Sequence, residues 1–227
     1  MAERLDPAER KRRILETAMA IIDREGHSEL TMRALARACG MTAPGVMHYF
    51  PTMPALVTAV VEYRDDRDTI DYDAFELTPG VGRRILDSVV DNIVAKPKAA
   101  ELFAMVQAQA IDPTHPGHDF FKDRAQEIKD MFSPILALDY AHPEEIICQV
   151  IPIIDGLQLN WLRDPQSFDL RERWDAIADA LFAAAPRTTV PWEESVAAVH
   201  ALLESLRAAA GTAGDEGTAH DEGIAGD

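Results

Sequence analysis

Apolar side chains along this chain of 227 residues recur mainly at every third or fourth position. This spacing places them on one face of an α-helix, whereas a β-strand would need alternating apolar and polar residues, of which the chain has no convincing run. In the first apolar segment, for example, Ile14, Ala18 and Ile21 share one helix face. We therefore predict an all-α fold.

Residues that start and stop helices stand at the ends of these apolar repeats. Asp6, with a proline after it and an acidic residue at position 9, is expected to cap the first helix through its side chain, and Gly26 is expected to end it. Thr31, Thr42 and Thr52 are the expected N-caps of the next three helices. Longer helices are predicted at about 80–95, 98–111, 119–138, 143–163, 169–185 and 192–209.

Residues 28–50 (SELTMRALARACGMTAPGVMHYF) predict two short helices joined by a tight turn at Gly40 and Met41. This order is the outline of a helix-turn-helix, whose second helix enters the major groove of DNA. Small side chains on the outward face of that helix would let it lie deep in the groove. The residues on this face are Ala43, Pro44, Gly45, Met47 and His48.

The stretch from about residue 10 to 62 resembles the N-terminal domain of the tetracycline-repressor (TetR) family of bacterial transcriptional regulators. The matching pieces are RRILETAMAIIDREG and LTMRALARACGMTAPGVMHYFPTMPALV. Family members typically have an aromatic residue near the end of the recognition helix, then Phe, a short turn and a Leu that opens the fourth helix. In this chain Tyr49, Phe50, Pro51 and Leu56 occupy those places.

The resemblance implies a division of the chain into a DNA-binding part and an effector part. We expect a helix-turn-helix domain at 1–50, a connector helix at 51–74, and a helical ligand-binding and dimerisation domain at 75–209. Residues 210–227 are acidic and rich in glycine, so they are predicted to be a disordered tail.

The resemblance also implies a set of DNA contacts. The chain departs from the family at Met47, where Tyr is common, and at Met53, where Lys is common. Both usual residues contact phosphates, so this chain lacks one hydroxyl donor and one cation of the expected footprint. The expected DNA-binding residues are Arg10, Arg12, Thr31, Arg33, Thr42, Ala43, Pro44, Gly45, His48, Tyr49 and Thr52.

The distribution of charge changes how the strongly acidic composition is interpreted. The formal net charge is −17, which taken alone argues against a nucleic-acid partner. Residues 1–64, however, carry nine Lys/Arg and eight Asp/Glu, so the net negative charge lies after residue 64. Such asymmetry favours a DNA-contacting segment on an acidic body that is held away from the phosphates.

The sequence contains no catalytic or metal-binding constellation. GxSxG, HExxH and GxxxxGK[ST] motifs are missing, and the two cysteines, Cys39 and Cys148, are too far apart for a metal clip. His115 and His118 would need further zinc ligands that have no obvious source. We therefore predict no enzymatic activity, no metal and no cofactor. Because neither a long apolar run nor a leader-like N-terminus is present, we expect a cytoplasmic protein with no membrane contact.

The predicted central helices contain aromatic, thioether and amide side chains in the proportions of an apolar ligand pocket with a few polar anchors. For any one of these residues an ordinary core position is the alternative. The candidate effector-binding residues are Phe103, Met105, Gln107, Phe121, Gln158 and Trp161.

Together these features predict a dimeric, sequence-specific transcriptional regulator. We expect a repressor that binds a palindromic operator in double-stranded DNA and that a small apolar effector releases. The resemblance implies a homodimer formed through the helices at 143–163 and 169–185. The sequence leaves one alternative open, a helical small-molecule binding protein with weakened or lost DNA binding, which Met47 and Met53 favour.

Overall fold

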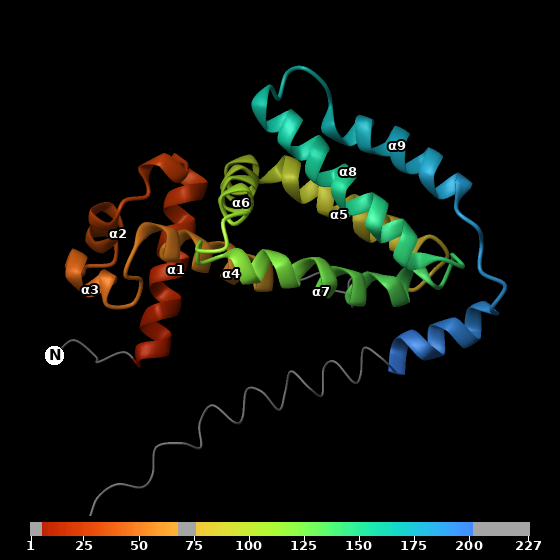
Figure 1. Ribbon diagram of the computed structural model, residues 1–227, viewed down its shortest axis with the longest axis horizontal. Coiled ribbons are helices and arrows are strands. Elements are labelled where there is room, and N and C mark those ends of the chain that lie inside the picture. The colour runs from red at the N-terminus through yellow and green to blue at the C-terminus, as the bar shows by residue number, and fades with distance from the viewer. Residues whose placement is uncertain (1–5, 68–75, 202–227) are drawn as a thin grey trace, which may run out of the picture.

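The computed structural model describes residues 6–67 and 76–201, and within these ranges the fold is all-α, as predicted. Figure 1 shows a small group of N-terminal helices beside a larger group of long ones. The elements are α1 (Pro7–Glu25), a 3₁₀ turn (His27–Glu29), α2 (Met32–Ala38), α3 (Ala43–Met47), α4 (Met53–Arg67), α5 (Val81–Ala95), α6 (Pro97–Gln109), α7 (His118–Leu136), α8 (Pro143–Arg163) and α9 (Leu170–Ala184). None of the described helices is long and apolar enough to span a membrane.

Three sequence expectations extend beyond the described residues. The predicted last helix is observed over 192–201, and its remaining positions to 209 lie outside the described residues. The same holds for residues 68–74 of the expected connector helix and for the expected tail at 210–227.

Threonine side chains cap the starts of α2, α3 and α4, as the sequence indicates. The hydroxyl oxygens of Thr31, Thr42 and Thr52 each accept a backbone N–H three residues later, at 3.1, 3.2 and 3.2 Å. Asp6 stands at the N-cap of α1, but its side chain makes no capping hydrogen bond, so this expectation was wrong. In a capping box the Glu9 side chain would also accept a hydrogen bond from the backbone N–H of Asp6. This bond is missing as well, because Glu9 pairs with Arg12 one turn further along α1.

Two hydrophobic clusters organise the molecule. The first is formed by α1 to α4 and includes Leu102 and Val106 of α6, which are almost fully buried. The second is formed mainly by α5, α7, α8 and α9, with Trp174 of α9 completely buried. Because α4 and α6 lie where the two clusters meet, these helices determine how the N-terminal group sits on the larger one (Figure 1).

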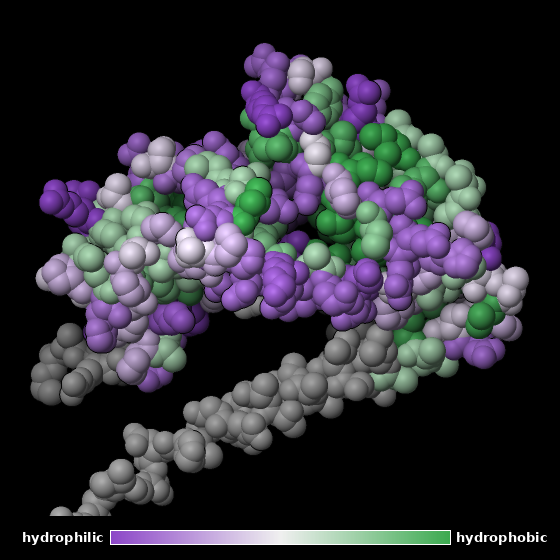
Figure 2. Space-filling view, in the orientation of Figure 1, coloured by the Kyte–Doolittle hydropathy of each residue, from purple (hydrophilic) through white to green (hydrophobic). Residues whose placement is uncertain are grey.

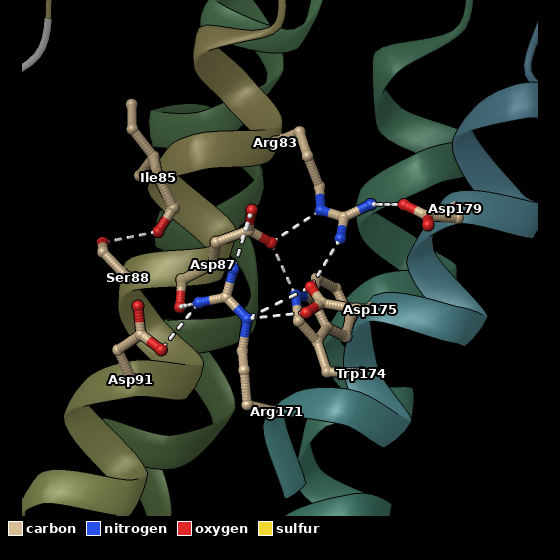
Figure 3. Close-up of polar contacts among 9 residues, drawn as sticks. All are labelled: Arg83, Ile85, Asp87, Ser88, Asp91, Arg171, Trp174, Asp175 and Asp179. Carbon is tan, nitrogen blue, oxygen red and sulfur yellow. Dashed lines mark hydrogen bonds and ion pairs between the residues drawn. The ribbon is translucent and has the colours of Figure 1, made fainter.

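A half-buried polar network joins α5 to α9 (Figure 3). The Asp87 carboxylate accepts hydrogen bonds from Arg83 Nε at 2.6 Å and from the indole N–H of Trp174 at 2.7 Å. Arg83 also reaches Asp175 and Asp179, both at 2.9 Å. Arg83 is thus surrounded by carboxylates from both helices. Asp87 also accepts the hydrogen bond from the indole N–H of the buried Trp174.

We expect Asp87→Ala to lower the free energy of unfolding by about 3 kcal/mol, because it leaves the indole N–H of Trp174 and the poorly exposed Arg83 short of an acceptor. Asp91→Ala is the matched control. Its carboxylate is mostly exposed and pairs with Arg171 at 2.6 Å, so we expect a loss of about 1 kcal/mol or less. Urea unfolding of the two variants at one protein concentration measures both values, and equal losses would contradict the assignment.

Candidate nucleic-acid interface and adjoining cavity

Helix α3 presents one apolar side chain inward and the rest of its short surface outward. Val46 is completely buried in the N-terminal cluster. Pro44, Met47 and His48 are exposed, Met47 to 47%, while Ala43 and Gly45 are half-buried. The outward face therefore has mostly small side chains and carries no Lys, Arg, Asp or Glu, which suits close approach to a groove.

Glycine shapes this face at two positions. Gly40, in the turn before α3, has φ of +65°, a left-handed conformation that other residues rarely adopt. At Gly45, an added Cβ would lie only 3.2 Å from the hydroxyl oxygen of Thr42. The missing side chain thus lets the Thr42 cap close over the first turn of α3.

Hydroxyl groups and cations surround α3. Thr31, Thr42 and Thr52 are exposed at the starts of α2, α3 and α4, and each hydroxyl keeps its own proton for an outside acceptor such as a phosphate. Arg33 is exposed and has no ion-pair partner in the part of the chain that the structure describes. Tyr49 is half-buried and packs edge-on against the ring of His48, with centroids 5.4 Å apart.

Arg10 and Arg12, the two predicted cations of α1, differ in their surroundings. Arg10 is half-buried and forms no ion pair with any described residue. Arg12 lies between Glu9 and Glu16, at 2.6 and 2.8 Å, and its hydrogen bond lowers the pKa of the Glu9 carboxyl. Its charge is therefore largely matched within α1 itself, a pairing that the sequence analysis did not anticipate.

Glu16 links this part of α1 to the far end of α4. Its carboxylate also accepts hydrogen bonds from the Tyr63 hydroxyl at 3.1 Å and from Arg67 at 3.2 Å. Arg12 and the end of α4 therefore share one carboxylate, so a displacement of α4 changes how firmly Arg12 is held.

A cavity of about 540 Å³ lies where the two hydrophobic clusters meet. It is lined mainly by apolar side chains of α1, α4, α5, α6, α7 and α8, such as Ile22, Val61, Leu86 and Phe132. Its volume is within the range of sites for drug-sized molecules. Residues of α1 and α4 form part of its wall, so an occupant next to that part of the wall would contact helices that pack against α2 and α3 in the N-terminal cluster.

Only two of the six candidate effector-binding residues line this cavity, namely Phe103 and Gln158. Met105 is exposed to 37%, and Trp161 belongs to the C-terminal core. Phe121 packs edge-on against Phe103. The side-chain amide of Gln107 donates a hydrogen bond to Asp155, which does line the cavity. The four that do not line the cavity are Met105, Gln107, Phe121 and Trp161.

The sequence analysis missed the charged residues of the wall. Asp155 is the only charged residue between Glu145 and Arg163, and this isolation within an apolar helix was the available signal. Burial raises the pKa of its carboxyl, an effect that the hydrogen bond from Gln107 opposes. Arg124 binds Asp65 through two hydrogen bonds of 2.9 Å.

Helix α6 also holds the C-terminal end of α1. Lys98 Nζ donates to the backbone carbonyls of Asp23 at 3.3 Å and Arg24 at 2.6 Å. A cation at these terminal carbonyls is electrostatically favourable. Just after α1, Nδ1 of His27 lies 3.8 Å from Oε2 of Glu101 in α6. The two helices are thus joined by polar contacts close to the cavity.

Comparison with known proteins gives one family match and several structural neighbours. Residues 14–60 match the family model described as "Bacterial regulatory proteins, tetR family". A transcriptional regulator from Rhodococcus sp. Rha1 is 18% identical with a TM-score of 0.61, covering 80% of this chain and 99% of that one. A TetR transcription regulator from Haloarcula marismortui is 16% identical with a TM-score of 0.59, covering 80% and 100%.

The multidrug binding protein EbrR, complexed with ethidium, is 15% identical with a TM-score of 0.57 and coverages of 76% and 98%. At these identities the three neighbours support the fold. No match was found among the curated proteins.

Proposed function

Through residues 14–60 this chain belongs to the tetR family of bacterial regulatory proteins, and we propose that it is a homodimeric repressor that a small-molecule effector releases from its operator. The observation that carries the proposal is the outward face of α3. It is small, exposed and flanked by three threonine-capped helix starts, which is what a helix entering a major groove requires.

The expected DNA-binding residues divide into two roles in this proposal. Those of α3 and its ends, Ala43, Pro44, Gly45 and His48, face the base edges. The others, among them Arg10, Thr31, Arg33, Tyr49 and Thr52, bind phosphates and fix the register. Arg12 joins this second group when Glu16 releases it.

The outer surfaces of α8 and α9 support the proposed homodimer. On α8 the exposed residues Pro152, Gly156 and Leu159 are uncharged, and on α9 Ala176 and Ala180 are exposed. Figure 2 shows apolar surface gathered where these two helices lie. Pairing of the two helices across a two-fold axis would cover this surface and place two α3 helices on one side of the assembly, about 34–36 Å apart for successive major grooves.

The position of the cavity supports effector control. A ligand there contacts α4 and α6 directly, and these helices hold α1 through Glu16 and through Lys98. Such a ligand shifts the protein between two arrangements only by binding one of them more tightly. EbrR, with a similar fold, binds ethidium, which fits a cavity that accepts small molecules.

The test is binding to a labelled duplex from the DNA next to the protein's own gene. A shuffled duplex of equal length and composition is the control. We expect the native duplex to bind at least about 1,000-fold more tightly, with two protomers per site and an affinity that falls steeply with salt. Equal affinity for both duplexes would refute sequence-specific regulation.

A second candidate, a helical small-molecule binding protein without DNA binding, is favoured by the exposed Met47, which offers a phosphate neither a donor nor a charge. Ligand binding in the cavity combined with no binding to either duplex would select this candidate.

A further inference from the structure

We propose that the cavity takes a small amphipathic organic cation, an amine or ammonium group on an apolar body, and that Asp155 receives its charge. This inference rests on the proposed function, since the cation would be the effector.

The carboxylate of Asp155 has acceptor capacity that its protein neighbours leave unused. Asp155 lies on α8 and lines the cavity. Within the described residues its one hydrogen bond comes from the neutral amide of Gln107, 3.1 Å from Oδ2. The positive charge of Arg124 acts on it from a greater distance, without forming an ion pair with it. A carboxylate accepts about four hydrogen bonds, so a donor inside the cavity would complete its environment.

The cations of the wall are already engaged. Arg124 is bound to Asp65 by two hydrogen bonds, and its guanidinium lies 4.9 Å from the ring centroid of Phe103. Arg64 and Lys96 have partners of their own. No lining cation is therefore left to attract an anionic ligand as Asp155 attracts a cationic one.

The remaining wall suits the body of such a ligand. Phe103 and Phe132 contribute aromatic surface, and aliphatic side chains from both clusters complete the lining. An apolar body loses water on entry, while the charged end pairs with the carboxylate in surroundings of low polarity, where the attraction is stronger than in water.

Affinity for the cation then depends on pH. Burial raises the pKa of Asp155 above its ordinary value, so the empty site holds a proton more readily than an exposed aspartate does. The cation pairs with the deprotonated form, and its affinity falls as the pH is lowered through this raised pKa. The charged groups that face the cavity are Asp23 of α1, Arg64 and Asp65 of α4, Lys96 before α6, Arg124 and Glu127 of α7, and Asp155 of α8.

Three probes with the same naphthyl body test the inference on the full-length protein by calorimetry. In buffer of about pH 7.5, 2-(1-naphthyl)ethylamine is a cation, 2-(1-naphthyl)ethanol is neutral and 1-naphthaleneacetate is an anion. We expect the amine to bind about tenfold or more tightly than the alcohol and the anion to bind most weakly. In Asp155→Asn, which keeps the shape, the amine should fall to the affinity of the alcohol, while the affinity for the alcohol is unchanged.

Glu127→Gln is the matched control. Glu127 also lines the cavity but is exposed to solvent, so we expect the Glu127→Gln protein to keep the preference for the amine. The inference is overturned if amine and alcohol bind equally, if the preference survives Asp155→Asn, or if no probe binds. Failure of the proposed function is a different result, in which the amine binds as expected but the protein has no specific DNA affinity for it to change.

Discussion

Replacing Pro44 with Glu is expected to abolish specific DNA binding without unfolding the recognition helix. Pro44 is exposed in the first turn of α3, where a carboxylate is compatible with the helix dipole. In the proposed complex the same carboxylate would face the phosphates and base edges of the groove. Because a like-charge contact costs several kcal/mol, we expect affinity for the native duplex to fall about 100-fold or more, measured by fluorescence anisotropy at a fixed salt concentration.

Two controls separate charge at this face from other effects of the change. Pro44→Gln removes the same proline without adding charge and should cost less than about tenfold. Ala125→Glu adds a carboxylate at an exposed position of α7 and should leave DNA affinity unchanged. If Pro44→Glu bound the native duplex as tightly as the unchanged protein, α3 would not be the recognition helix.

The helices were predictable because their signals are local. Apolar spacing and proline or threonine at a helix start act within a few residues, so the segment expected at 143–163 is observed as Pro143–Arg163. At Asp6 the local pattern predicted a side-chain cap that the structure does not show. Its neighbours fit a capping pattern, yet the acidic residue that should complete it is drawn to Arg12 instead. Two local preferences competed, and the ion pair prevailed.

The composition of the cavity wall was not predictable in the same way. Phe103 and Trp161 are both large aromatic residues on apolar helices, but only Phe103 reaches the cavity, while Trp161 packs in the C-terminal core. Which face of α6 or α8 meets the void depends on how the helices cross, and helical periodicity carries no information about crossing. Asp155 was identifiable in principle, since a single charge in a long apolar helix needs a partner or a function.

Gly156→Arg is expected to dissociate the proposed homodimer and, with it, to remove specific DNA binding. Gly156 is exposed on the outer face of α8, and a Cβ added there meets no atom within 4 Å. The protomer can therefore accept the side chain, and Arg is a better helix former than Gly by up to about 1 kcal/mol. In a symmetric interface through α8, however, both copies would bring a large cation into close packing, which should raise the dimer dissociation constant about 100-fold or more.

Sedimentation equilibrium and DNA anisotropy on the same samples decide the point. Ala125→Arg adds the same side chain at an exposed site on α7 and should remain dimeric, and Gly156→Ala tests the loss of glycine alone. If two protomers read the operator at once, as proposed, a folded monomer should keep only weak, salt-sensitive affinity for either duplex. A Gly156→Arg protein that stays dimeric would move the interface away from α8, whereas a monomeric protein that still binds the native duplex tightly would show that one protomer is enough for recognition.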